Sequence, residues 1–125
     1  MRTLEITSDL RVKPKGRPRF YNGRAITDSA TREFEQTVKR LFAGLAHGHP
    51  FEGPIEVRLE VYFERPKKTA FSYPPRGDCD NLFKSVADAA NVVLWADDSQ
   101  IIKMTCSKKW SDSDGFALVI KEVEL

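Results

Sequence analysis

The sequence is poor in the residues on which many hydrolases depend. It has two cysteines and two histidines among 125 residues. Cys79 and Cys106 are too few for a disulfide framework and form no zinc-ligand pair. His47 and His49 both fall at the end of a predicted helix, so serine-protease-like and zinc-hydrolase chemistry have little support.

Long apolar runs are also missing. None approaches the roughly 18–20 residues that span a bilayer, and residues 1–5 lack the apolar core of a signal peptide. We therefore expect a cytoplasmic protein with reduced thiols. A chain with 41% hydrophobic and 30% charged residues is expected to form one globular domain over residues 1–125.

The sequence also lacks an excess of charge of one sign, because its net charge is only +2. This near-neutrality is a cancellation between opposed patches. Residues 1–24 carry seven Lys or Arg against two acids, whereas residues 78–100 carry five Asp against one Lys. Residues 103–109 add three further lysines and no acid. Basic segments suited to phosphate therefore flank an acidic segment suited to a cation.

Hydrophobic periodicity predicts four strands and two helices. Apolar and polar residues alternate from Ile55 to Phe63, which is the clearest strand pattern. The predicted elements, in order, are a weak strand over 4–8, a helix that starts after 27–29 and is closed by Gly48, the strand over 55–63, a helix over about 81–94, and strands near 100–110 and 116–124. This β-α-β-α-β-β order predicts an α+β domain, with one mixed four-stranded sheet covered by two helices.

Cations occupy every second position of the N-terminal segment, at Arg11, Lys13, Lys15, Arg17 and Arg19. In a strand, side chains two apart share a face at a spacing of about 6.6 Å, which suits successive phosphates of a nucleic acid. In polyproline geometry the row would splay. A solvated edge that resists aggregation is the structural alternative.

Residues 64–77 form a long predicted loop that is rich in proline. Arg65, Lys67, Lys68 and Arg76 accompany two aromatic residues of this loop, Phe71 and Tyr73. Interleaved cations and rings suit contact with bases and backbone together. Rings that pin the loop to the core are an equally good interpretation.

Asp78 and Asp80 are two apart, directly before the second predicted helix. In an extended chain both carboxylates face the same side, where a hard cation such as Mg²⁺ would relieve their repulsion. Asp80 is also a good helix N-cap, but capping explains only one of the two. A second acidic pair, Asp97-Asp98, follows the helix at a turn, where aspartate is common in any case.

A polar stripe of Asn81, Lys84, Asp88 and Asn91 follows one face of the same helix. Lys84 is placed to meet a phosphate or to stabilise charge that develops on it. Lys84 and Asp88 would alternatively form an ordinary surface ion pair. Together, the acids and the basic segments indicate metal-assisted phosphodiester hydrolysis. A non-catalytic DNA-binding protein, whose acids are caps, turns and salt bridges, is the alternative.

With these motifs the chain resembles the RusA-type Holliday junction resolvases, which are small phage-associated endonucleases. The resemblance lies in four motifs, which are Lys15-Gly16-Arg17-Pro18-Arg19-Phe20, Asp78-x-Asp80-Asn81-Leu82-x-Lys84 with Asp88-Ala89, Asp97-Asp98-Ser99-Gln100-Ile101, and Lys109-Trp110. The chain departs from the family pattern at two places. Ala90-Asn91-Val92 stands where Leu-Asn-Gly is frequent, and Cys79 replaces an aliphatic residue.

The resemblance implies that Asp78, Asp80, Asp98 and Lys84 are the essential catalytic set, with the three aspartates as metal ligands and Asp97 in support. It implies Mg²⁺ as cofactor, with Mn²⁺ as a substitute, and four-way DNA junctions as substrate. A metal nuclease that acts on flaps, forks or plain duplex is the related alternative. The residues that we expect to contact DNA are Lys13, Lys15, Arg17, Arg19, Arg76, Asn81 and Lys84.

Helix length adds an expectation about assembly. A continuous helix over 81–94 would be about 21 Å long, which would place Asp98 at the opposite end from Asp78 and Asp80. Two such helices, packed antiparallel across a two-fold axis, would bring Asp98 of each chain to the acidic pair of the other. We therefore expect a homodimer with shared active sites.

Overall fold

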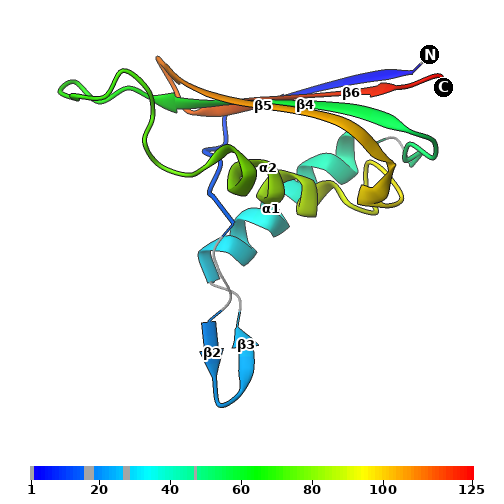
Figure 1. Ribbon diagram of the computed structural model, residues 1–125, viewed down its shortest axis with the longest axis horizontal. Coiled ribbons are helices and arrows are strands. Elements are labelled where there is room, and N and C mark those ends of the chain that lie inside the picture. Colours follow the sequence, from blue (N-terminus) through cyan, green and yellow to red (C-terminus); the bar gives the residue numbers. More distant parts are fainter. Residues whose placement is uncertain (1, 16–18, 27–28, 47) are drawn as a thin grey trace.

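The computed structural model describes residues 2–15, 19–26, 29–46 and 48–125. Its centre is a sheet of four strands in the order β1-β6-β4-β5. Two helices lie against one face of this sheet (Figure 1). The elements of this body are β1 (Thr3–Ser8), α1 (Ser29–Leu45), β4 (Ile55–Glu64), α2 (Cys79–Ala90), a short 3₁₀ helix η1 (Asp98–Gln100), β5 (Ile101–Ser111) and β6 (Gly115–Glu122). The predicted α+β class, with a mixed four-stranded sheet and two helices, is confirmed.

The sheet is mixed because its last pair runs parallel. β6 pairs antiparallel with both β1 and β4, whereas β4 and β5 are parallel. A parallel pair needs a long crossover, and loop 64–77 together with α2 provides it. β5 is the last strand in the sheet order, so its outer edge is unpaired within the described residues.

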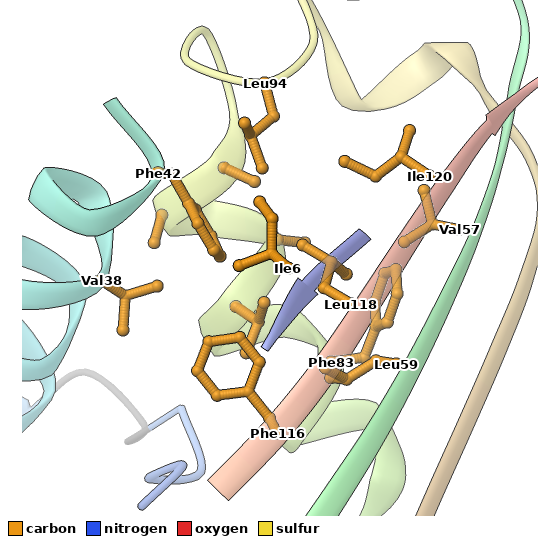
Figure 2. Packing of buried hydrophobic residues seen from close by; sticks show 14 of the residues in the cluster. Ile6, Val38, Phe42, Val57, Leu59, Phe83, Leu94, Phe116, Leu118 and Ile120 are labelled. Carbon is orange, nitrogen blue, oxygen red and sulfur yellow. The ribbon is translucent and has the colours of Figure 1, made fainter. Parts of the chain in front are cut away.

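The core lies between the sheet and the two helices. Alternate side chains of β4, such as Val57 and Leu59, are fully buried, as the alternation in the sequence predicts. Phe42 of α1 meets Phe116 of β6 edge to face, with 6.2 Å between ring centroids. Figure 2 shows Phe83 of α2 among the labelled residues of the same cluster. No described helix is long and apolar enough to cross a bilayer.

Helix α2 ends earlier than the sequence pattern predicts. It covers Cys79–Ala90 rather than 81–94, and Asn91 is its C-cap. Val92 follows with φ +73°, and its N–H donates to the Trp95 carbonyl over 2.7 Å. The helix stops here because Trp95, which is completely buried, can enter the core only if the chain turns back.

The sequence analysis missed a short hairpin in the basic segment. β2 (Arg19–Tyr21) and β3 (Arg24–Ile26) pair antiparallel and project from the body of the molecule (Figure 1). Asn22 and Gly23 join them with positive φ angles, which is the backbone of the Asn-Gly hairpin turn. Residues 11–15 lie in no strand, so the strand interpretation of the cationic row does not hold there.

Candidate active site

Asp78 and Asp80 lie at the beginning of α2. Asp78 occupies the N-cap position with extended backbone, yet its side chain makes no capping hydrogen bond. Asp80 lies in the first turn, and both side chains are exposed. The alternative in which Asp80 is the N-cap is therefore wrong. Two carboxylates face solvent at a helix N-terminus, where the helix dipole favours negative charge.

Two hydrogen bonds to the backbone and one close approach fix this helix start. Gly77 has φ +78°, and its carbonyl accepts a 2.8 Å hydrogen bond from Lys108 Nζ on β5. The Lys15 N–H donates to the Asn81 carbonyl over 3.1 Å. A Cβ at Gly77 would lie 2.8 Å from Pro14 Cγ. The basic segment, α2 and β5 are thus joined at the acidic pair.

Cys79, the residue between the two aspartates, is half-buried and faces β5. Burial, the neighbouring Cys79 thiol and the Asp80 carboxylate together raise the pKa of Cys106 on β5 to about 12, against the smaller opposite effect of Lys108. Both thiols are free. The Cys106 thiol is therefore neutral at pH 7, and the Asp80 carboxylate lies near enough to this part of β5 to act on it.

Asp98 begins η1 at the other end of α2. Its Oδ1 accepts a 2.7 Å hydrogen bond from Trp95 Nε1. Trp95 is completely buried, whereas the Asp98 side chain is exposed. A fixed indole therefore orients this carboxylate and leaves its second oxygen available. The sequence analysis missed Trp95, although a buried indole N–H needs a partner and Asp98 is three residues along.

Asp97 has a structural role in the same turn. Its Oδ2 accepts from the Ser99 N–H at 2.9 Å, while its own N–H donates to Gln100 Oε1 at 2.8 Å. Hydrogen bonding from the Ser99 hydroxyl, and secondly from the Ser99 N–H, lowers the pKa of Asp97. This reciprocal pattern is a capping box. Asp97 is therefore a helix cap. If Asp97 supports the site, it does so by fixing the backbone that carries Asp98.

A groove of about 380 Å³ separates α2 from the beginning of β5. The residues that line it are Phe83, Lys84, Ala87, Asp88, Asp98, Ile101, Ile102, Lys103 and Met104. The groove thus brings two of the expected site residues, Lys84 and Asp98, to one surface. Asp78 and Asp80 are not among the described residues that line it.

Asp98 and the acidic pair remain apart because α2 and β5 run in opposite directions (Figure 1). The beginning of β5 lies along the last turns of α2, whereas Cys106 and Lys108 reach its first turn. The twelve residues of α2 are about 18 Å long. Within the described residues, no three His, Cys, Asp or Glu side chains are close enough to hold a metal ion.

Asp88 pairs with Lys15 rather than with Lys84. Lys15 Nζ lies 2.8 Å from Asp88 Oδ2 and also forms an ion pair with Glu35 of α1. Burial lowers the pKa of Lys15, but its hydrogen bonds with Asp88 and Glu35 and their charges outweigh that effect and raise it. The predicted surface pair between Lys84 and Asp88 is not among the described ion pairs, and Lys84 is left exposed in the groove.

The other predicted DNA contacts differ in accessibility. Lys13 and Arg76 are exposed, Asn81 is half-buried, and Lys15 is occupied by two carboxylates. Arg19 lies in β2, and Arg17 lies outside the described residues.

Comparison with known proteins identifies the family of the chain. Residues 9–121 match the family model described as endodeoxyribonuclease RusA. The chain is also 30% identical, over 129 aligned positions, to the uncharacterized protein YqaN of Bacillus subtilis (strain 168). That alignment covers 87% of this chain and 89% of the relative. The chain belongs to the RusA endodeoxyribonuclease family, which is a family of nucleases.

Proposed function

We propose that this protein is a Mg²⁺-dependent endonuclease that resolves four-way DNA junctions by paired, symmetric nicks. The observation that carries the proposal is the state of Asp78 and Asp80. Both are exposed at one helix start, the Asp78 side chain forms no cap, and neither side chain is in an ion pair within the described residues. Carboxylates arranged in this way suit a hard divalent cation.

The donor set fits magnesium. Asp78, Asp80 and Asp98 supply carboxylate oxygens, which Mg²⁺ prefers over nitrogen or sulfur. When bound, the cation would act as a Lewis acid on the scissile phosphate. Hydrolysis adds water across one phosphorus–oxygen bond, which increases negative charge on the phosphoryl oxygens. Lys84, exposed one turn after Asp80 on α2, would stabilise that charge. Mn²⁺ is expected to substitute.

The site is completed in a dimer. Since Asp98 of one chain lies away from that chain's Asp78 and Asp80, each site would combine the acidic pair of one subunit with the partner's Asp98. Ile102 and Met104 of β5 are about half exposed, at 50% and 46%, beside the groove. An apolar strip on an unpaired sheet edge is suited to cover by a second copy. Two sites related by a two-fold axis match two symmetric nicks.

The same geometry weighs against a purely DNA-binding role. That alternative assigns every acid to a cap, a turn or a salt bridge, and Asp97 and Asp88 do have such roles. Asp78 and Asp80 make no such capping bond or ion pair within the described residues. Two carboxylates without a neutralising cation would repel the phosphates of DNA. A cation between them would turn this repulsion into attraction. A nuclease that acts on flaps or forks would use the same residues.

The test compares cleavage of a labelled four-way junction with that of a matched duplex, in Mg²⁺ or in EDTA. We expect junction cleavage in Mg²⁺ alone, with the duplex left intact. Asp80→Asn should abolish cleavage while DNA binding persists. Asp112→Asn is the matched control, since Asp112 is an exposed acid in the β5–β6 turn and its loss should change nothing. Binding without cleavage under every condition would contradict the proposal and favour the DNA-binding alternative.

A further inference from the structure

Loop 64–77 presents two aromatic rings to solvent. Phe71 and Tyr73 are 47% and 56% exposed, and their rings meet edge to face with 5.9 Å between centroids. By contrast, seven of the described aromatic side chains are buried in the core, namely Phe34, Phe42, Phe51, Phe63, Phe83, Trp95 and Phe116. The interpretation in which Phe71 and Tyr73 pin the loop to the core is therefore wrong. Their exposed faces contribute little to folding and are available to a ligand.

The rings stand on a loop that is fixed at several points. Trp110 Nε1 donates to the Phe71 carbonyl at 3.0 Å, and the Phe71 N–H donates to Thr69 Oγ1 at 3.2 Å. The Arg65 N–H donates to the Ser111 carbonyl at 3.0 Å. Pro74, directly after Tyr73, is buried. A loop held in this way loses little conformational entropy when it binds a ligand.

The surroundings of the rings are cationic. Arg65, Lys67, Lys68 and Arg76 are exposed, and residues 65–77 contain no acid. None of these four cations forms an ion pair with a described residue. Positive charge beside open aromatic faces is the chemistry of single-stranded nucleic acid recognition, in which bases stack on rings and phosphates meet cations. An apolar protein partner would not need this charge.

The position of the rings connects them to the acidic pair. Tyr73 is separated from Asp78 by Pro74, Pro75, Arg76 and Gly77, and Lys108 holds Gly77 against β5. In Figure 1 the loop extends past the end of the sheet and then returns to the start of α2. A strand whose phosphate lies at Asp78 and Asp80 would therefore have its neighbouring bases within reach of the rings.

We propose that Phe71 and Tyr73 form a stacking platform for unpaired bases of the DNA strand that is cut. The inference rests on the proposed function, because it assigns to that nuclease the recognition of opened bases at a branch point. Stacking is independent of base identity, since every base has a π-face. The platform would favour branched DNA over intact duplex, whose bases are already stacked on one another.

The test measures binding of a thymine oligonucleotide, a four-way junction and a blunt duplex, with every protein carrying Asp80→Asn so that nothing is cut. We expect the double variant F71A/Y73A to lose roughly tenfold or more in affinity for the oligonucleotide and the junction, with duplex binding unchanged. F71W/Y73W should restore affinity, whereas F71L/Y73L, apolar but without a π-face, should not. A 2-aminopurine placed at the branch point should change its fluorescence on binding only when the rings are present.

The matched control removes charge from the same loop. K67A/K68A should weaken binding to all three DNAs alike and reduce its salt dependence, because these lysines meet phosphates of any DNA. The inference would be overturned if F71A/Y73A bound the oligonucleotide and the junction as tightly as its parent. It would also be overturned if F71L/Y73L restored full affinity, or if F71A/Y73A lost as much affinity for the duplex as for the other two DNAs. If the protein without Asp80→Asn fails to cut junctions, the proposed function fails instead, while the oligonucleotide measurements still decide whether the rings stack bases.

Discussion

Trp95 Nε1 lies 2.7 Å from Asp98 Oδ1, and this bond joins a completely buried indole to an exposed carboxylate. The core thus determines the orientation of a side chain whose own surroundings are solvent. Outer hydrogen bonds of this kind tune metal ligands, and their loss typically reduces metal affinity or activity by about 10- to 100-fold.

Trp95→Phe should therefore raise the Mg²⁺ concentration needed for half-maximal junction cleavage by roughly tenfold. The reason is that Asp98 loses the donor that orients it, while the aromatic ring in the core is kept. A titration of cleavage rate against Mg²⁺ measures this effect. Trp110→Phe is the matched control, because its indole bonds to the Phe71 carbonyl and not to an acid. An unchanged Mg²⁺ dependence in Trp95→Phe, with lowered thermal stability alone, would argue for a purely structural indole.

Mixing inactive subunits tests whether the active sites are shared. In a heterodimer of Asp80→Asn and Asp98→Asn chains, one of the two sites keeps all three aspartates, so nicking should return at up to about half the rate per dimer of the unmodified protein. Refolding the mixed chains together and measuring nicks on a labelled junction gives the result. A mixture of Asp78→Asn and Asp80→Asn is the control, because both of its sites carry a damaged acidic pair. An Asp80→Asn and Asp98→Asn mixture that stays inactive would mean that each chain builds its own site.

Lys13 and Lys15 are expected to differ, although both belong to the same basic row. Lys15→Ala should lower the free energy of unfolding by about 1–2 kcal/mol, because Asp88 and Glu35 lose their shared cation. Lys13→Ala, at an exposed position, should change stability by less than about 0.5 kcal/mol and reduce the salt slope of DNA binding by about 1. Chemical denaturation and salt-dependent binding separate the two effects. Equal stabilities of the two variants would contradict the ion pairs as a structural link.

The contribution of Lys15 should also depend on pH in a defined direction. Its pKa is raised above the ordinary value of 10.5, so the folded state holds the proton more tightly than the unfolded state. The stabilisation is complete below about pH 10 and is lost as pH rises through the raised pKa. The difference in unfolding free energy between the unmodified protein and Lys15→Ala should therefore be constant from neutral to mildly alkaline pH and shrink above it.

Val92→Gly should stabilise the protein. Val92 has φ +73° and a side chain that is 68% exposed, so its β-branched side chain is strained and contributes little packing. Relief of about 1–2 kcal/mol exceeds the loss of about 0.4–1 kcal/mol from the more flexible unfolded glycine. A net gain of about 1 kcal/mol, or roughly 4 °C in Tm, should appear in thermal unfolding. Val93→Gly, next in the chain and without a positive φ, should instead lower Tm. A lower Tm for Val92→Gly would contradict the strain.

Much of the fold follows from local pattern. The alternation from Ile55 to Phe63 predicts β4, because a strand buried on one face of a sheet must repeat every two residues. The β2–β3 hairpin could not be predicted from hydrophobic alternation, although Asn22-Gly23 is a good turn signal, because its strands of three residues each are too short to show a period of two. The early end of α2 was not predictable from periodicity, because Val93 continues the apolar stripe of Leu82, Val86 and Ala89. The burial of Trp95 overrides that pattern.

The sequence alone determined the family and the residue types of the candidate site. Two aspartates before a helix, a lysine one turn later and a second acidic pair define a chemistry, because charge and ligand type belong to side chains. Only the tertiary structure decided which acids are available. Asp97 caps η1 and Asp88 pairs with Lys15, whereas Asp78 and Asp80 remain exposed. Helix length already predicted that Asp98 lies away from that pair. The structure adds the physical arrangement, because β5 runs antiparallel to α2 and the buried Trp95 indole holds Asp98 at the far end of the helix.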